Sequence, residues 1–289
     1  IFQISEDTLF TINDLIRLRA TDTPQTPLVA FPRNKHNVSD WEEFTEQDLS
    51  NFTNGTVKCL KDLGLKQVSE EMTAAILGQS DLDFAIATFA LIRLGYSPCI
   101  VSPRLSADAI NKLLDLASSR VLLFTPQFQE FAQGLTAIRD LGIFPVPGRN
   151  VYDVAALELL KDTPYKRSAP SNAGKVAVCM HSTGLISLPR LIPFTHGRFL
   201  NLALNAYKME VLCTMPFFHG IGYMSFLQAV YSRYVAYCFD SNVPQTHKTL
   251  TTALKATAPE AVVTVPYALK LFTEKDGGVE LHGFRNPCK

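Results

Sequence analysis

Residues 73–101, TAAILGQSDLDFAIATFALIRLGYSPCIV, give the clearest indication of the fold class. Two short apolar runs, Thr73 to Leu77 and Pro98 to Val101, flank an apolar segment from Leu82 to Leu94 that is long enough for a helix. A strand, a helix and a second strand in this order form the unit from which parallel sheets are built. The stretch therefore predicts a buried parallel strand pair joined by a crossover helix.

The same alternation continues to the C-terminal side. Short apolar runs indicate further strands over 120–124, 176–180, 191–194, 211–215, 234–239 and 261–265. Longer segments between them predict helices over 107–117, 127–141, 196–207, 222–232 and 245–257, with Thr195 as a helix cap. The fold class is α/β, with mainly parallel sheets flanked by helices. Such sheets bind ligands at the carboxyl ends of their strands.

A polar stretch interrupts this alternation. It contains Pro164, Pro170, Asn172 and Gly174, residues typical of loops. We therefore predict a first α/β subdomain over residues 1–170 and a second over residues 171–289.

Composition narrows the classes of partner. Of the 289 residues, 47% are apolar and 19% charged, and 27 basic residues balance 27 acidic ones. No net charge draws the chain to nucleic acid, and its basic residues form no stripe with aromatic ones. The longest apolar runs fall short of the roughly 20 residues that cross a bilayer. The first residues lack a signal-peptide pattern. We expect a cytoplasmic protein that binds neither nucleic acid nor a membrane.

The cysteines and the short motifs exclude further sites. Six cysteines are scattered through apolar runs without a CxxC pair, as buried free thiols are, and only Cys179 and His181 lie close in sequence. We expect no metal site. The chain lacks the GxGxxG, GxxxxGK[ST], GxSxG and HExxH patterns, which argues against a dinucleotide oxidoreductase, a P-loop NTPase, an α/β-hydrolase and a zincin.

The sequence HSTG, His181 to Gly184, follows a predicted buried strand. Small and hydroxyl-bearing residues at such a place let backbone N–H groups and hydroxyls converge on phosphate oxygens. An ordinary polar turn would have the same composition. The tetrapeptide alone therefore leaves both interpretations open.

The surrounding sequence resembles the adenylate-forming (AMP-binding) family. Without a gap, Ser182, Thr183, Gly184, Pro189 and Arg190 match the family's phosphate loop. LIPFTHGRF and MPFFHGIG are similar to the two motifs that follow, and LGYSPCIVSPR to an upstream one. The resemblance covers nearly the whole chain. Within a family that includes acyl-CoA synthetases, it is strongest to adenylation domains of fungal non-ribosomal-peptide-synthetase-like proteins and aryl-acid reductases.

The predicted phosphate-binding set is Ser182, Thr183, Gly184, Ser187 and Arg190. Leu185 and Ile186 stand where the family has hydroxyl residues, and Ser187 where it has glycine. A hydrogen bond to a charged group contributes about 1.5–3 kcal/mol, so two lost donors should weaken ATP binding severely. A shifted register is the alternative, and it needs two compensating gaps.

The resemblance places the acyl substrate beside two later segments. The predicted substrate-binding residues are Phe218, His219, Gly220, Gly222, Val265 and Pro266. Each has a plainer alternative: His219 as a packed core histidine, the glycines as a helix start, and Val265-Pro266 as a strand-to-helix turn.

As function, the resemblance implies ATP-dependent activation of a carboxylic acid through an acyl-adenylate, with ATP and Mg²⁺. The acid is expected to be aryl or medium-chain, and carrier or reductase domains are expected in a longer protein. Family motifs for adenine, ribose and the catalytic lysine would follow Lys289, so we assign no catalytic residue and expect a truncated, impaired enzyme. The alternative is a non-catalytic remnant that binds an acyl group or a nucleotide.

Overall fold

The structure, a computed structural model, describes residues 9–23, 25–34, 37–159, 168–182, 189–204 and 208–273. Its helices are α1 (Ile12–Asp22), α2 (Glu46–Asp62), α3 (Leu82–Arg93), α4 (Ala107–Leu116), α5 (Gln129–Thr136), α6 (Arg149–Leu159), α7 (His196–Leu204), α8 (Gly220–Ser232), α9 (His247–Thr257) and α10 (Pro266–Thr273). The strands are β1 (Pro27–Asn34), β2 (Asn37–Thr45), β3 (Met72–Leu77), β4 (Tyr96–Val101), β5 (Val121–Phe124), β6 (Gly142–Pro145), β7 (Val176–His181), β8 (Leu191–Thr195), β9 (Val211–Cys213), β10 (Ala236–Cys238) and β11 (Ala261–Val263).

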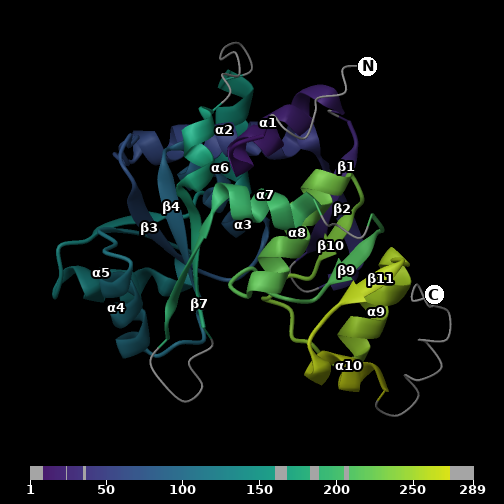
Figure 1. The fold of residues 1–289 in the computed structure, drawn as a ribbon. Coiled ribbons are helices and arrows are strands. Elements are labelled where there is room, and N and C mark those ends of the chain that lie inside the picture. The colour runs from purple at the N-terminus through teal and green to yellow at the C-terminus, as the bar shows by residue number, and fades with distance from the viewer. Residues whose placement is uncertain are drawn as a thin grey trace.

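These strands form two sheets, which lie on opposite sides of the view in Figure 1. One has six strands in the order β6-β5-β3-β4-β7-β8, and the other five in the order β11-β9-β10-β1-β2. Neighbours are parallel except at β7–β8 and β1–β2. The predicted α/β class with mainly parallel sheets is confirmed.

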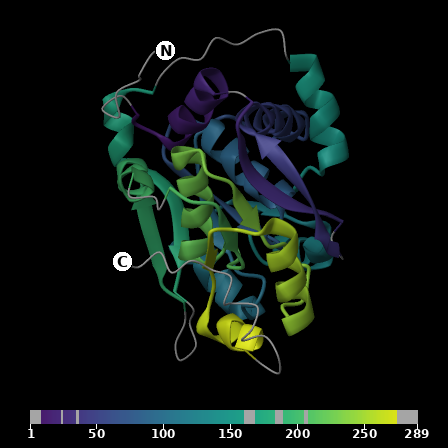
Figure 2. The ribbon, with the colours of Figure 1, turned by 90° about the vertical axis from the view of Figure 1, so that its right-hand side faces the viewer.

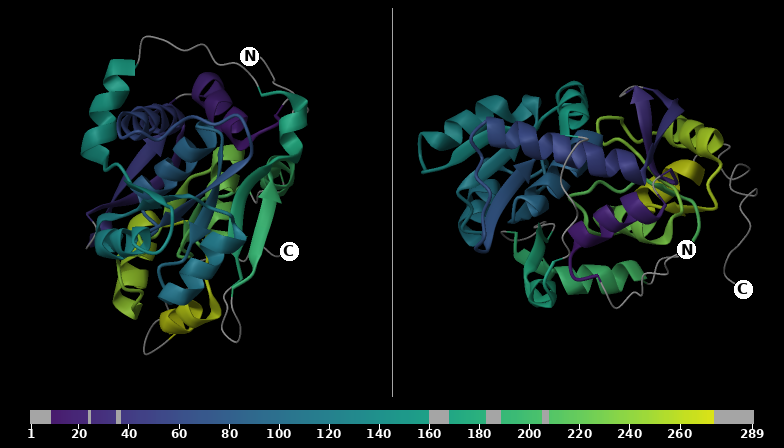
Figure 3. Two further views of the ribbon diagram at one scale, coloured as in Figure 1. Left: turned by 90° about the vertical axis from the view of Figure 1, so that its left-hand side faces the viewer. Right: turned by 90° about the horizontal axis from the view of Figure 1, so that it is seen from above.

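Three apolar clusters hold the layers together. Helices α4 and α5 pack on one face of the six-stranded sheet. Helices α9 and α10 pack on one face of the five-stranded sheet and lie in front in Figure 2. The largest cluster joins the other faces of both sheets through α3 and α8, whose Phe89 and Phe226 rings lie 5.3 Å apart. Figure 3 shows α2 lying across this middle layer when the molecule is seen from above. The sheets are thus fixed to each other by a shared core.

Residues 73–101 fold into a strand, a helix and a strand as predicted, and local interactions explain why. The Asp81 side chain accepts a hydrogen bond from the Phe84 N–H at 2.9 Å and so caps the start of α3. Gly95 ends the connection to β4 with φ of +95°, and a Cβ there would lie 2.2 Å from the Val68 carbonyl oxygen. No other residue fits this turn.

The remaining elements divide into those that the sequence predicted and those that it missed. All the expected strands are present, and β8 returns antiparallel to β7 as a hairpin. The helix expected over 127–141 is shorter, because α5 ends at Thr136 and β6 follows. The elements before residue 70, together with β6 and α6, were missed, whereas α10 begins at Pro266, where the sequence predicted a strand-to-helix turn.

The two sheets do not divide the chain at residue 170. Strands β1 and β2 pair with β10 and belong to the sheet of β9 and β11, whereas β7 and β8 join the sheet of β3 to β6. Each sheet therefore contains strands from both sides of the predicted subdomain boundary.

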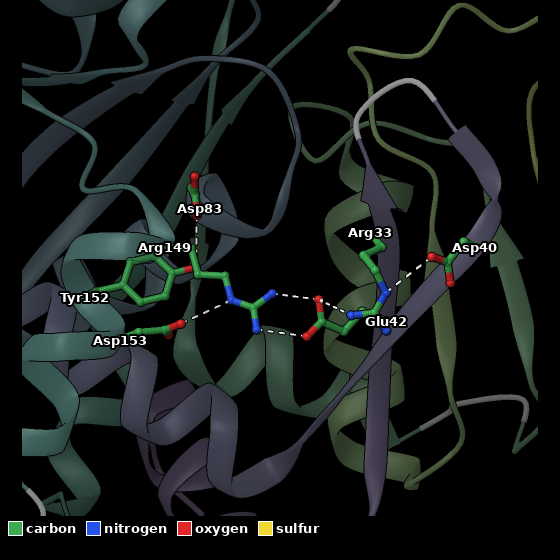
Figure 4. A network of polar contacts seen from close by, with 7 residues as sticks. All are labelled: Arg33, Asp40, Glu42, Asp83, Arg149, Tyr152 and Asp153. Carbon is green, nitrogen blue, oxygen red and sulfur yellow. Dashed lines mark hydrogen bonds and ion pairs between the residues drawn. The ribbon is translucent and has the colours of Figure 1, made fainter.

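A polar network that the sequence did not reveal links α6 to β2 (Figure 4). Arg149 donates to both carboxylate oxygens of Glu42, at 2.7 and 2.9 Å, and its guanidinium lies over the Phe44 and Phe52 rings. Hydrogen bonding from Arg149 lowers the pKa of Glu42. Tyr152 donates to Asp83 on α3 at 2.9 Å. The network fixes α6 between β2 and α3.

In the described part of the chain, no helix has the length and apolar character to cross a membrane. The five described cysteines, at positions 59, 99, 179, 213 and 238, are buried and free, as expected from their apolar contexts.

Candidate functional site

The loops at the carboxyl ends of the two sheets contact each other. Ser80, after β3, accepts a hydrogen bond from the Phe217 N–H at 2.7 Å, and its own N–H donates to the Ser241 hydroxyl at 2.6 Å. Phe217 follows β9 and Ser241 follows β10. The edge at which parallel sheets bind ligands is therefore shared by both sheets.

His181 joins the ends of β4 and β7 at this edge. The Ser102 N–H donates to His181 Nε2 at 3.0 Å, so Nε2 carries no proton, and Nδ1 donates to the Ser182 carbonyl oxygen at 2.9 Å. Burial lowers the pKa of His181. The neutral ring thereby connects the turn after β4 to the first residue of the predicted phosphate loop.

The predicted phosphate loop is the connection of the β7–β8 hairpin. At its stem, the Ser182 N–H donates to the Arg190 carbonyl oxygen, and the Arg190 N–H donates to the Ser182 hydroxyl, both at 3.0 Å. Arg190 is exposed. Thr183, Gly184 and Ser187 lie outside the described residues, so their predicted role stays a prediction.

Phe218 lies at the same edge, in the turn between β9 and α8. Its ring is mostly buried, and the exposed Arg104 guanidinium lies over it at 5.4 Å. Arg104 belongs to the turn whose Ser102 contacts His181. The structure therefore brings the phosphate-loop stem and the start of α8 to the two sides of one turn.

His219 follows directly and is the residue before α8. Its Nδ1 is buried and has no hydrogen-bond partner in the described part of the chain. Burial lowers the pKa of His219, which favours the neutral ring. His219 therefore keeps a buried ring nitrogen that has no partner among the described residues, at the edge where parallel sheets bind ligands.

The two glycines of α8 differ. A Cβ at Gly220 would meet only the Met180 sulfur, at 3.5 Å, so this position lies beside the end of β7. A Cβ at Gly222 would lie 2.3 Å from the Pro216 carbonyl oxygen and 2.5 Å from that of Met215. Backbone already fills the space beside Gly222, which gives this glycine a structural reason.

Val265 and Pro266 connect β11 to α10. Val265 is half-buried against the outer cluster of the five-stranded sheet, and Pro266 is exposed at the first position of α10. Near them, the Thr214 and Thr264 hydroxyls share a hydrogen bond of 2.6 Å at the carboxyl ends of β9 and β11. No hydrogen bond or ring contact joins these residues to His219 in the described part of the chain.

Sequence reasoning missed the serines and the arginine that hold this edge together. Ser80 and Ser241 carry no motif, and only the folded chain brings them together. Ser102 and Arg104 stand in a turn whose resemblance to the family was visible, but their partners His181 and Phe218 are distant in sequence.

The arrangement agrees with a match to a protein family over residues 17–285, described as AMP-binding enzyme. The chain belongs to the AMP-binding enzyme family. The resemblance seen in the sequence is thereby confirmed.

Relatives and solved structures extend this finding. The chain is 28% identical over 224 residues to a non-ribosomal peptide synthetase of Acremonium egyptiacum, covering 71% of this chain and 19% of that protein. It is 25% identical over 261 residues to an adenylate-forming reductase of Stachybotrys bisbyi, a match that covers 84% of this chain and 24% of that protein. The chain thus spans about a quarter of these relatives or less. The fold is similar to that of the o-succinylbenzoate-CoA synthetase of Bacillus subtilis, with a TM-score of 0.71 at 16% identity over 91% of this chain and 64% of that one.

Proposed function

We propose that this chain is part of an adenylation module that activates a small carboxylic acid. An oxygen of the acid attacks the α-phosphorus of ATP, the bond to pyrophosphate breaks, and an acyl-adenylate and pyrophosphate result. The observation that carries the proposal is the family match over residues 17–285, with the phosphate-loop stem at the shared edge of the two sheets. The solved structure of the Bacillus subtilis relative holds an acyl-adenylate intermediate, which supports this reaction class.

The described residues have separate tasks in this proposal. The Ser182 hydroxyl accepts from the Arg190 N–H, which leaves its own proton free to donate to a phosphate oxygen. The exposed Arg190 supplies a positive charge beside it. His219 and Phe218 would border the acid. A neutral imidazole can donate one hydrogen bond to a carboxylate.

Mg²⁺ is implied by the family. Among the described residues, no group of three or more His, Cys, Asp or Glu side chains could hold a metal ion. Bound to the phosphates of ATP, Mg²⁺ would screen their charge. The proposed roles of Ser182 and Arg190 do not depend on it.

The substrate is proposed to be an aryl or medium-chain acid, because aromatic and aliphatic residues surround His219 in PFFHGIGYMSF. Two relatives are a peptide synthetase and a reductase, so we propose carrier or reductase domains as partners within a longer cytoplasmic protein.

A second candidate has its own support. Leu185 and Ile186 replace hydroxyl residues of the family's loop, which favours a protein that binds an acid without turnover. An acid that stabilises the chain against heat, without supporting catalysis, would favour this candidate.

Acid-dependent exchange of labelled pyrophosphate into ATP tests the proposal. We expect weak exchange by the natural chain and stronger ATP binding by the variant Leu185→Ser, Ile186→Thr, Ser187→Gly. Arg190→Gln should weaken ATP binding in that variant about 10-fold or more, since a hydrogen bond to a charged group is lost. If neither chain binds ATP or an acid at all, the proposal fails.

A further inference from the structure

A cavity of about 250 Å³ lies at the opposite, amino-terminal edge of the six-stranded sheet. Tyr96 and Ser97, which begin β4, line it together with Lys175 and Val176 at the start of β7. His196, the first residue of α7, also lines the cavity, and its backbone N–H donates to the Lys175 carbonyl oxygen at 3.1 Å. The cavity is far along the strands from His181 and Ser182 and belongs to no part of the proposed adenylation site.

His196 is one of the buried polar residues that line this cavity, with 8% of its surface exposed; Thr11 and Ser97 are others. The Ile12 N–H donates to its Nδ1 at 3.3 Å, so Nδ1 carries no proton and the neutral ring carries it on Nε2. In the described part of the chain, Nε2 has no hydrogen-bond partner. A buried side chain thus presents an unused donor beside a polar cavity.

The other free groups nearby are also donors. Lys175 is exposed at the rim, and its side chain has no carboxylate partner in the described residues. The amide of Asn172 and the NH₂ group of Asn13 line the same cavity, and the Asn13 oxygen is already occupied by Arg93 at 2.9 Å. Helices α1 and α7 both begin here, and helix starts carry partial positive charge.

Three carboxylates, those of Asp14, Glu70 and Glu71, lie near the cavity and would repel an anion. Asp14 lies near His196, but its oxygens accept hydrogen bonds from Thr11 N–H at 2.9 Å and Ser168 N–H at 3.0 Å. Glu71 accepts from Val176 N–H at 3.2 Å and is exposed, as is Glu70. The buried carboxylate is therefore satisfied, and the other two lie at the solvent side.

We propose that this cavity binds a small oxyanion, with His196 Nε2–H and the Lys175 ammonium as its principal donors. Inorganic phosphate or a phosphate-bearing metabolite has the required chemistry, because several donors line one cavity and a phosphate group accepts several hydrogen bonds. The proposal is independent of catalysis at the other edge.

Calorimetric titration with inorganic phosphate at constant ionic strength tests it. The chain should bind phosphate saturably, with a Kd in the millimolar range or below. His196→Asn keeps an oxygen that can accept from the Ile12 N–H, but it places no donor where Nε2 lies. Lys175→Met removes the positive charge and keeps a side chain of similar length. Each should weaken binding about 10-fold, the usual size for one lost charge-assisted hydrogen bond.

Two control variants make the result decisive. Lys112→Met, at an exposed position of α4, removes one positive charge elsewhere and should leave the Kd unchanged. Lys248→Met, at an exposed position of α9, removes a charge beside the other sheet and should also leave the Kd unchanged. The proposal is overturned if the natural chain does not bind phosphate, if the two cavity variants bind as it does, or if either control loses as much affinity. Because Lys175 is exposed, Lys175→Met decides the question even if His196→Asn unfolds.

Discussion

Two histidines at opposite ends of one hairpin differ in their tautomers. His181, at the end of β7, accepts at Nε2 and donates from Nδ1. His196, just after β8, accepts at Nδ1 and keeps its proton on Nε2. Burial lowers the pKa of both rings, that of His196 to about 4. Both are therefore neutral near pH 7.

The two histidines differ in whether a ring nitrogen remains without a hydrogen-bond partner among the described residues. Both nitrogens of His181 are occupied by backbone groups, so this ring can only connect the two loops that it touches. His196 fixes the start of α1 with one nitrogen and has a donor left over. A buried histidine whose bonds are all made serves structure, whereas one with an unused nitrogen beside a cavity is available for a ligand.

Replacing His181 should have the largest effect. His181→Leu removes two hydrogen bonds and leaves the N–H of buried Ser102 without an acceptor, so we expect the free energy of unfolding to fall by about 2–3 kcal/mol. Urea denaturation followed by Trp41 fluorescence measures this. His181→Gln offers an oxygen near the position of Nε2 and should recover about half. A loss below about 0.5 kcal/mol, typical of surface substitutions, would contradict the connecting role.

Lowering the pH should destabilise both ends of the β7–β8 hairpin, where His181 and His196 lie. A histidine whose pKa is lowered by folding binds its proton first in the unfolded chain, so its stabilising contribution is complete above about pH 6.5 and is lost as the pH falls. For His196 the loss continues to about pH 4, the pKa of the folded state. Between pH 7 and pH 5 we expect His196 to cost about 1–2 kcal/mol, and His181 to act in the same direction.

Denaturation curves at several pH values give the change in the free energy of unfolding with pH. We compare this change between the natural chain, His181→Gln and His196→Asn. Each variant should have a shallower dependence than the natural chain. Parallel curves for all three would show that neither ring is held neutral by the fold.

Replacing His196 by leucine should have a smaller effect on stability. His196→Leu leaves the Ile12 N–H without its acceptor but gains apolar burial, so we expect a net loss of about 1 kcal/mol. His196→Asn should restore most of it while still losing phosphate binding. If leucine and asparagine were equally destabilising, the bond to Ile12 would not be the reason.

The smallest effect is expected at the hairpin stem. Ser182→Ala removes the acceptor of the Arg190 N–H but keeps the backbone bond from Ser182 to Arg190, and Arg190 is exposed. We expect a change of about 0.5 kcal/mol or less, detectable as faster hydrogen exchange at the Arg190 amide. Ser182→Thr keeps a hydroxyl and should leave the exchange rate unchanged. Unchanged exchange in Ser182→Ala would show that the hydroxyl does not hold the stem.

Sequence reasoning succeeded where the signal is local. The strand, helix and strand around Asp81 and Gly95 follow from apolar runs, a cap and a turn, all close in sequence. It failed where the signal depends on distant partners. Nothing near Ser80 announces Phe217 or Ser241, and nothing near His196 announces the cavity. The pairing of β1 with β10 was invisible for the same reason.

That pairing has a consequence for synthesis on the ribosome. Strand β1 lies between β2 and β10, and β10 begins about 200 residues later, which takes roughly 10–40 s at 5–20 residues per second. The six-stranded sheet ends at β8 and can pair well before then. Until β10 is synthesised, the backbone N–H and C=O groups on that side of β1 have no strand to pair with, and apolar residues such as Val29 and Phe31 stay exposed. The edge of β1 that faces β10 is thus open to pairing with other chains for most of the synthesis of residues 27–236.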